Sequence, residues 1–265
     1  MNNKKQLSIT KIFKSWQDFH HFEQYVKKRN RFFYDSITQA FLQIILETSK
    51  SRTETVEKDS ILWRSQLGND WEPYYEGGQL IDHFPGPLGP EKMKPLNNLA
   101  SEGRANPKGI PYLYLATNDN TAMAEVRPWL GSYISIGQFK LTKDVKLINC
   151  TSDDKNSSVY LKEPDAIKRE VAVWRDIDRA FSRPITINEN TADYVPTQIL
   201  AEFFKNNGFN GIGYRSSLGK GHNIVLFDLD SADLINCTLH EVKKVSFDFT
   251  QTSNTYFISK YLKSK

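Results

Sequence analysis

The stretch GRANPKGIPYLYLATNDNTAMAEV, at positions 103–126, constrains the fold more than any other part of the chain. Its apolar run at 110–116 predicts a strand. Asn118 or Asn120 can then cap a helix that begins almost at once, and Pro128 breaks this helix or bends its end. A loop, a strand and a capped helix in such close order indicate a segment built to hold a ligand.

The chain before this segment reads as helical up to about residue 50. Apolar and aromatic positions recur at helical spacing in SWQDFHHFEQYVKK, and Asp35 can cap a second helix. A polar linker follows, so we divide the chain into an N-terminal helical region (1–55) and a larger domain (56–265). The helical region is either a module that regulates the protein, mediates oligomerisation or binds a partner, or a packing extension of the larger domain.

Strands outnumber helices after residue 60, and few strands alternate strictly with helices. This order favours an α+β fold over a doubly wound parallel sheet. The segment 68–110 shows little periodicity and is rich in Gly, Pro and Asn, which predicts a long irregular loop that is functional or mobile. Pro164 suits the first turn of one helix, and Gly208 ends another. The predicted strands are 61–66, 110–116, 133–141, 145–149, 211–217, 222–229 and 241–249, and the predicted helices are 163–181 and 197–207.

The composition, with 25% charged and 39% hydrophobic residues, is that of a globular protein. No apolar run approaches the roughly 20 residues that span a bilayer, and the polar N-terminus lacks the apolar core of a signal peptide. These features predict a cytoplasmic protein that does not associate with membranes. The cysteines and histidines have no spacing that suits zinc or a disulfide framework, so we expect Cys150 and Cys237 to be buried structural residues.

The formal net charge is +4, and much of the positive excess lies early in the chain. A mildly basic protein can bind nucleic acid or a polyphosphate. A solvated helix face accounts for the same charges. Both interpretations stay open at this point.

Arg64 lies among apolar neighbours in the predicted strand 61–66. A buried arginine is costly without an anion beside it, so it needs either a structural salt bridge or a phosphate group. Its planar guanidinium suits phosphate because it donates two parallel hydrogen bonds. The loop GRANPKG adds Arg104 and lets the backbone approach a ligand closely.

Glu125 sits among small and apolar neighbours in the predicted helix. It is either a solvated helix-face residue or a buried functional carboxylate, and Arg127 would face elsewhere. Ser216 follows a strand and opens a Gly-rich loop, where a serine can also serve simply to hydrogen-bond the turn. No G-x-S-x-G elbow and no suitably placed histidine accompany it, which argues against a nucleophilic triad.

In their order along the chain, these features resemble the RES domain family, which is named for its Arg, Glu and Ser. The resemblance rests on an arginine on an early strand, the GR-x-N-x-x-G loop, YLYLA, the TAMAE helix, and YRS followed by HNIVLF. It spans about residues 60–230 and assigns the three family residues to Arg64, Glu125 and Ser216. Members often carry a bulkier residue where Ala105 stands, so this position departs from the pattern.

The resemblance implies an ADP-ribosyltransferase-like α+β fold with a mixed sheet and flanking helices. It also implies a bacterial toxin of a toxin–antitoxin pair that consumes NAD+ as its substrate. The ADP-ribose acceptor is water, phosphate or a protein, and the sequence leaves this choice open. The implied partners are an Xre-type antitoxin that covers the NAD+ pocket and, in the last case, an acceptor protein. An oligomer is compatible with the resemblance.

The chemistry of such a reaction gives the residues their expected roles. Breaking the nicotinamide–ribose bond develops positive charge on the ribose, which Glu125 is expected to stabilise. We expect Arg64 first and Arg104 second at the pyrophosphate. Tyr114 is expected to stack on nicotinamide or ribose, and Ser216 to hydrogen-bond nicotinamide or a phosphate. Nicotinamide is a good leaving group, so no metal or further cofactor is expected. The residues expected to bind NAD+ are Arg64, Arg104, Asn106, Tyr114 and Ser216.

The rival hypothesis is an RNA-binding or RNA-cleaving toxin that uses the basic N-terminal helical region. It predicts steeply salt-dependent RNA binding, although His20, His21 and Arg29 do not form a spacing typical of RNA cleavage. A third possibility is a catalytically inactive RES scaffold that binds NAD+ or a partner. The presence of the full Arg, Glu and Ser set argues against that loss of activity.

Overall fold

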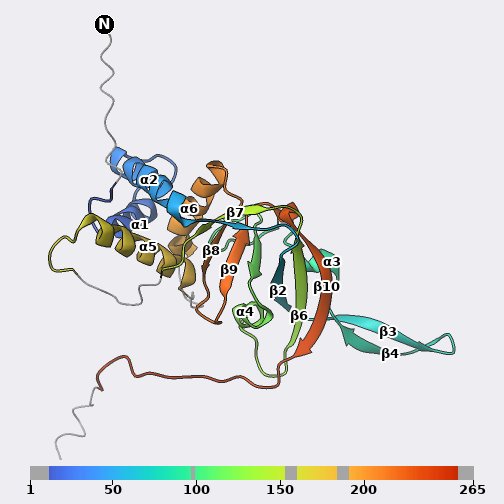
Figure 1. Ribbon diagram of the computed structural model, residues 1–265. Coiled ribbons are helices and arrows are strands. Elements are labelled where there is room, and N and C mark those ends of the chain that lie inside the picture. The colour runs from blue at the N-terminus through green and yellow to red at the C-terminus, as the bar shows by residue number, and fades with distance from the viewer. Residues whose placement is uncertain (1–11, 97–98, 153–159, 184–190, 256–265) are drawn as a thin grey trace, which may run out of the picture.

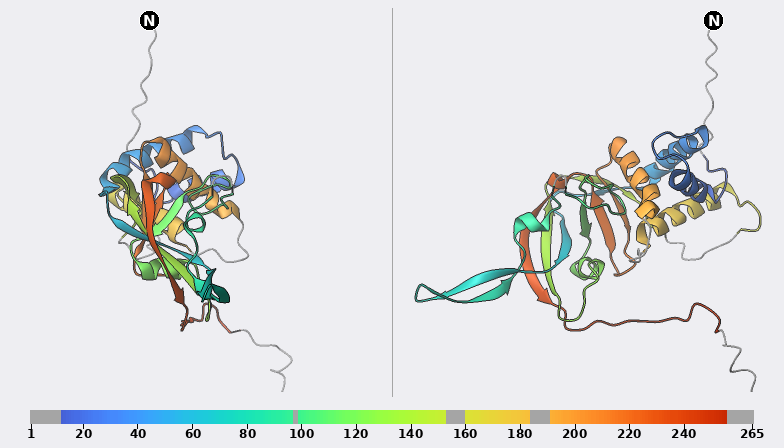
Figure 2. Two further views of the ribbon diagram at one scale, coloured as in Figure 1. Left: turned by 90° about the vertical axis from the view of Figure 1, so that its right-hand side faces the viewer. Right: turned by 180° about the vertical axis from the view of Figure 1, so that it is seen from behind.

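A computed structural model describes residues 12–96, 99–152, 160–183 and 191–255 and shows one large curved sheet flanked by helices (Figure 1). Helices α1, α2, α5 and α6 gather at one end of the molecule, and a two-stranded hairpin projects from the other (Figures 1 and 2). The helices are α1 (Asp18–Lys28), α2 (Ser36–Ser49), α3 (Pro90–Met93), α4 (Asp119–Glu125), α5 (Ala166–Ser182) and α6 (Val195–Asn206), with short 3-10 turns η1 (Lys50–Arg52), η2 (Thr191–Tyr194) and η3 (Leu229–Ser231). The strands are β1 (Thr53–Val56), β2 (Ile61–Leu67), β3 (Asp70–Glu76), β4 (Gln79–Gly86), β5 (Leu113–Ala116), β6 (Tyr133–Leu141), β7 (Val145–Asn149), β8 (Gly211–Arg215), β9 (His222–Leu226) and β10 (Ala232–Glu241).

The large sheet has eight strands in the order β1-β7-β8-β9-β5-β2-β6-β10. Strands β7 and β8 are parallel, and the other neighbouring pairs are antiparallel. This mixed sheet with flanking helices confirms the predicted α+β fold. Across the described ranges, no helix has the length and apolar character that a bilayer crossing needs.

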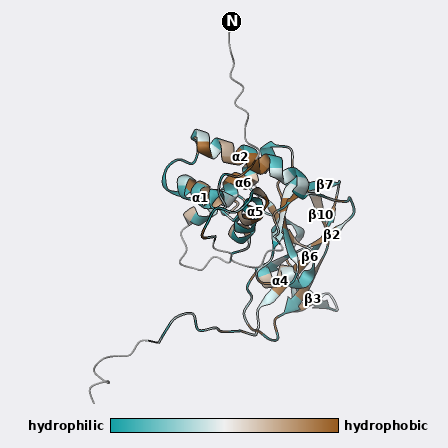
Figure 3. Cartoon of the chain, turned by 60° about the vertical axis from the view of Figure 1, so that its left-hand side comes forward, coloured by the Kyte–Doolittle hydropathy of each residue, from teal (hydrophilic) through white to brown (hydrophobic). Residues whose placement is uncertain are grey.

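The N-terminal helices form where the sequence predicts them. Asp35 caps α2, because its Oδ1 accepts a hydrogen bond of 2.8 Å from the backbone N–H of Thr38. Helix α1 buries Phe19, Phe22 and Val26 in the core that α5 and α6 also share. Apolar residues are visible along α2 in Figure 3. These two helices therefore pack onto the body of the molecule, and the division into two domains stays a prediction.

Helices α5 and α6 differ from the prediction only at their ends. The cap of α5 is Asp165, whose carboxylate accepts the backbone N–H of Lys168 at 2.9 Å, so Pro164 precedes the cap and is not part of the first turn. Gly208 has a φ of +84°, a left-handed conformation that ends α6 as predicted. The apolar faces of both helices fill the core beside β8, where Trp174 and Phe204 are fully buried.

The prediction of one long irregular loop at 68–110 is wrong, because the segment contains the β3–β4 hairpin and the short helix α3. Gly77 and Gly78 join the two strands with φ values of +58° and +82°. Two left-handed residues in a two-residue turn match the twist of a hairpin, and glycine takes that conformation without strain. The sequence does not predict this hairpin because most of its side chains are exposed on both faces. It therefore lacks the alternation of apolar and polar residues that is typical of a half-buried strand.

The predicted strand 241–249 is also wrong. Its place is taken by β10, which pairs with β6 and ends where Glu241 lies opposite Tyr133, the first residue of β6. Val242 still forms backbone hydrogen bonds of 2.9 Å with Gly131 and Ser132, and beyond it the chain leaves the sheet. Cys150, after β7, is fully buried as expected, whereas Cys237 lies within β10 and is only half-buried, so the expectation of burial is wrong for Cys237; both thiols are free.

Candidate functional site

A cavity of about 300 Å³ opens beside α4, and we call it the Glu125 cavity. Strands β2 and β5 form one side of it and α4 another, with single residues from β8 and β9. Asn118 caps α4, because its side-chain oxygen accepts a 2.8 Å hydrogen bond from the backbone N–H of Thr121. The lining residues are Trp63, Arg64, Ser65, Gln66, Tyr114, Leu115, Ala116, Ala122, Glu125, Val126, Tyr214 and Asn223.

Glu125 is the last residue of α4, and other elements of the fold hold its carboxylate. Ser216 Oγ and Asn223 Nδ2 each donate a hydrogen bond of 2.7 Å to the same oxygen, Oε1. Within the described part of the chain, Oε2 has no hydrogen-bond partner. The carboxylate is therefore oriented through one oxygen while the other stays available to a ligand in the cavity.

Ser216 is 5% exposed and all its hydrogen-bonding capacity is engaged. Its Oγ accepts the backbone N–H groups of Leu218 at 3.1 Å and Gly219 at 2.9 Å, and it donates its proton to Glu125. The two acceptor interactions fix the direction of the hydroxyl proton. Ser216 thus positions the carboxylate, and the predicted direct contact with nicotinamide or phosphate stays a prediction.

The glycine-rich loop after β8 packs tightly against the beginning of α4. Gly221 N–H donates to Thr121 Oγ1 and His222 N–H donates to Thr117 Oγ1, both at 3.0 Å. A Cβ atom at Gly221 would lie 2.4 Å from Asn118 Nδ2. A side chain at this position would have to displace the Asn118 side chain that caps α4, so glycine favours the close approach of this loop to α4.

Arg64 enters the cavity from β2 without an ion pair among the described residues. Its Nη1 donates to the backbone oxygen of Tyr114 at 3.1 Å, and its buried Nε has no hydrogen-bond partner in the part of the chain that the structure describes. Burial lowers the pKa of the guanidinium to about 10, so it is still charged at neutral pH. Of the two interpretations of Arg64, the geometry favours the ligand-binding one over the structural salt bridge.

Tyr114 separates the cavity from the loop at 103–106. Its hydroxyl donates to Asn106 Oδ1 at 2.7 Å and accepts the N–H of Ala105 at 3.0 Å, so it faces the loop. Burial raises the pKa of Tyr114 to about 12. Asn106 is itself committed to the loop, because its Nδ2 donates to the carbonyls of Ser101, Pro107 and Ile110. Asn106 thus braces the loop, and the ring of Tyr114 is the part that lines the cavity.

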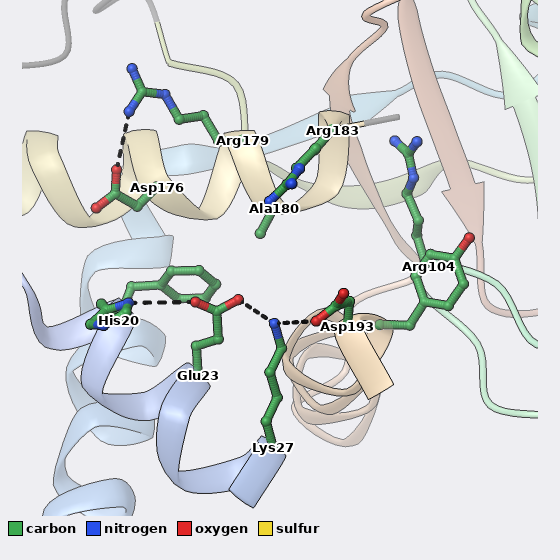
Figure 4. A pocket seen from close by; sticks show the side chains of 11 residues that line it. His20, Glu23, Lys27, Arg104, Asp176, Arg179, Ala180, Arg183 and Asp193 are labelled. Atoms are coloured by element: carbon green, nitrogen blue, oxygen red, sulfur yellow. Dashed lines mark hydrogen bonds and ion pairs between the residues drawn. The ribbon is translucent and has the colours of Figure 1, made fainter. Parts of the chain in front are cut away.

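Arg104 lies beyond Tyr114 and lines a second cavity of about 290 Å³, which we call the Arg104 cavity. Its Nη1 donates to the carbonyl of Phe181, at the end of α5, and the described residues include no carboxylate partner for it. Figure 4 shows Lys27 in this cavity between Glu23 and Asp193, at 2.6 and 2.8 Å. The second cavity is thus walled by α1, α5 and η2, and Arg104 lies at its edge with no ion-pair partner among the described residues.

The structure brings Arg64, Tyr114 and Glu125 to one cavity and places Ser216 directly behind the carboxylate. It places Arg104 and Asn106 on the other side of Tyr114. Sequence reasoning missed Asn223, although a polar residue within the apolar strand HNIVLF was a signal for it. An oriented carboxylate and a largely buried guanidinium that has no ion-pair partner among the described residues can together stabilise a ligand that carries both positive and negative charge.

A family model described as RES domain matches residues 85–250. A search of curated proteins found no significant match. A solved structure described as the crystal structure of the M. tuberculosis MbcT–MbcA toxin–antitoxin complex contains a chain that aligns with 74% of this chain and 91% of its own length, at 13% sequence identity and a TM-score of 0.38. The family match covers Arg104, Glu125 and Ser216 but starts after Arg64.

Proposed function

Because the chain belongs to the RES domain family, we propose that it cleaves the nicotinamide–ribose bond of NAD+ with Glu125 as the catalytic carboxylate. The observation that carries this proposal is the way Glu125 is held. Ser216 and Asn223 fix Oε1, and Oε2 has no partner in the described structure at the wall of a cavity that also contains Arg64.

The reaction requires what this carboxylate can supply. As the bond to nicotinamide breaks, the ribose takes on oxocarbenium character and positive charge. A preoriented carboxylate stabilises that charge without having to reorganise. Nicotinamide leaves as a neutral molecule, so no acid has to protonate it. One fixed carboxylate therefore suffices for the bond-breaking step.

The size of the Glu125 cavity decides which part of the substrate it would hold. At about 300 Å³ it lies at the lower end of the range for small-molecule sites. It suits nicotinamide and its ribose against the ring of Tyr114, with the pyrophosphate toward a cation. We assign the pyrophosphate to Arg64 first, since Arg64 shares the cavity with Glu125, and to Arg104 second.

NAD+ incubated with the purified protein, with and without inorganic phosphate, tests the proposal and identifies the acceptor. Free ADP-ribose indicates water as the acceptor, and phosphorylated ADP-ribose indicates phosphate. Nicotinamide release that needs an added cell extract indicates a protein acceptor. A protein that releases no nicotinamide under any of these conditions does not have the proposed activity.

We propose further that the protein acts as a toxin which depletes NAD+, and that an antitoxin of the Xre type covers the mouth of the Glu125 cavity. Induced expression should then lower cellular NAD+ before growth stops, and co-expression of the cognate antitoxin should prevent both effects. The rival RNA hypothesis predicts growth arrest with unchanged NAD+, so the order of the two events separates the hypotheses.

A further inference from the structure

The β3–β4 hairpin is an exposed arm with the composition of a contact surface. It projects from the end of the sheet, away from the rest of the molecule (Figures 1 and 2). A two-stranded hairpin is marginally stable on its own in water, and large apolar side chains on it remain costly to expose. Its exposed large apolar residues are Trp71, Tyr74, Tyr75, Leu80, Ile81 and Phe84, each at least 46% exposed.

The arm is also acidic. Residues 70–86 contain four carboxylates and no lysine or arginine. Asp70 is engaged at the base of the arm, where it pairs with Lys92 and accepts the N–H of Gly89. Within the described residues, Glu72, Glu76 and Asp82 have no cationic partner. The arm therefore presents aromatic side chains together with three uncompensated negative charges.

A groove that is also apolar but carries the opposite charge lies at the other end of the molecule, between α1 and α2. It encloses about 400 Å³, and Phe22, Phe41 and Ile44 line it. Ile37, at its edge, is 69% exposed.

Basic residues surround this groove. Lys14, Lys28 and Arg29 line it, and none of them has a carboxylate partner in the described structure. The two carboxylates that line the groove each accept a backbone hydrogen bond at the beginning of a helix. Asp18 accepts the N–H of Lys14, just before α1, and Asp35 accepts that of Thr38 as the cap of α2. The groove is therefore apolar at its centre and positively charged at its rim.

We propose that the arm of one copy of this chain binds in the α1–α2 groove of a second copy. Both surfaces are rich in apolar residues and they carry opposite charges, and neither has a partner among the described residues of its own chain. The arm does not reach the groove of its own chain, because the two lie at opposite ends of the molecule (Figure 1). A single arm–groove contact leaves one arm and one groove unfilled, so the smallest closed assembly is a dimer in which both arms are exchanged.

The oligomeric state of the full-length protein, measured by sedimentation over a concentration series, tests this inference. The wild type should form a closed dimer. Replacing the arm residues in Trp71→Ser/Phe84→Ser should weaken self-association by at least about thirtyfold, as expected for buried aromatic anchors. The control Leu99→Ser/Lys108→Glu changes an exposed apolar residue and an exposed lysine that belong to neither the arm nor the groove, and it should dimerise like the wild type.

Charge exchange separates this contact from other modes of association. Lys28→Glu/Arg29→Glu in the groove should weaken the dimer, and adding Glu72→Lys/Asp82→Lys in the arm should restore it. Circular dichroism confirms that each variant is folded. A wild type that stays monomeric at every concentration overturns the proposal, as does a dimer that is insensitive to the arm and groove variants.

Discussion

Ser216 Oγ donates a 2.7 Å hydrogen bond to Glu125 Oε1, although the two residues are 91 positions apart in the chain. The bond ties the loop after β8 to the end of α4. The backbone N–H groups of Leu218 and Gly219 donate to Ser216 Oγ and fix its position. The geometry makes Ser216 a positioning residue for the Glu125 carboxylate, whose Oε2 has no hydrogen-bond partner among the described residues.

Replacing this serine should lower the rate of NAD+ cleavage more than substrate binding. In Ser216→Ala, Glu125 keeps the hydrogen bond from Asn223 but loses the one from Ser216, so its carboxylate is less firmly oriented. Small misplacements of a reacting group can cost about 100-fold in rate. We expect kcat to fall by about that factor with KM little changed. Ser216→Thr keeps the hydroxyl and should recover much of the loss. A Ser216→Ala protein with wild-type kcat contradicts the positioning role.

Removing the Arg64 charge should stabilise the ligand-free protein while weakening NAD+ binding. Burial lowers the folded pKa of Arg64 from 12.5 to about 10, so the charged form is penalised at every pH below about 10. Arg64→Met removes this penalty but also loses the hydrogen bond to Tyr114, for a net gain of roughly 1 kcal/mol in the free energy of unfolding. Thermal unfolding without ligand measures the gain. A destabilised Arg64→Met protein that still binds NAD+ normally argues against the assignment.

We also predict that substrate binding depends on pH through the Arg64 guanidinium. The guanidinium is charged below about pH 10 and loses its proton as the pH rises through that value, so its attraction for a pyrophosphate is lost in the same direction. We expect KM for NAD+ to rise as the pH approaches 10 in the wild type. In Arg64→Met, KM should be high throughout and should lack this rise. An identical rise in both proteins would assign the effect to another group.

The close packing of the glycine-rich loop on α4 makes Gly221 intolerant of a side chain. In Gly221→Ala the new Cβ would lie 2.4 Å from Asn118 Nδ2 and 2.7 Å from Thr117 Oγ1. Relieving such overlap costs about 1–3 kcal/mol and should displace Ser216 from Glu125. Gly213→Ala is the matched control, since its Cβ meets no atom within 4 Å. The free energy of unfolding in denaturant and the rate of NAD+ turnover should both fall for Gly221→Ala. Both should stay close to the wild-type values for Gly213→Ala.

Local sequence signals predicted the parts of this fold that local interactions determine. Asp35 caps α2 and Asn118 caps α4, and the sequence had left Asn120 as an equal candidate for the second cap. Glu125 lies in the predicted helix, of which Thr121 and Ala122 are the buried residues.

The missed features depend on contacts between distant parts of the chain. Asn223 reaches Glu125 only because β9 and β5 are neighbours in the sheet, and nothing in HNIVLF encodes that pairing. Arg104 and Tyr114 are close in sequence but line different cavities. Tyr114 lines the Glu125 cavity, while its hydroxyl is hydrogen-bonded to the loop that carries Arg104. The hairpin was missed because it is exposed on both faces, which removes the pattern that marks a strand.

The most direct measurement is nicotinamide release from NAD+ by the wild type and by Glu125→Gln, quantified by chromatography at equal protein concentration. Glutamine keeps the oxygen that Ser216 and Asn223 hold but removes the negative charge. The proposed function predicts release by the wild type and a loss of at least about 100-fold in the variant. Equal release by the two proteins would show that the cleavage does not depend on the charge of Glu125, and it would contradict the central claim.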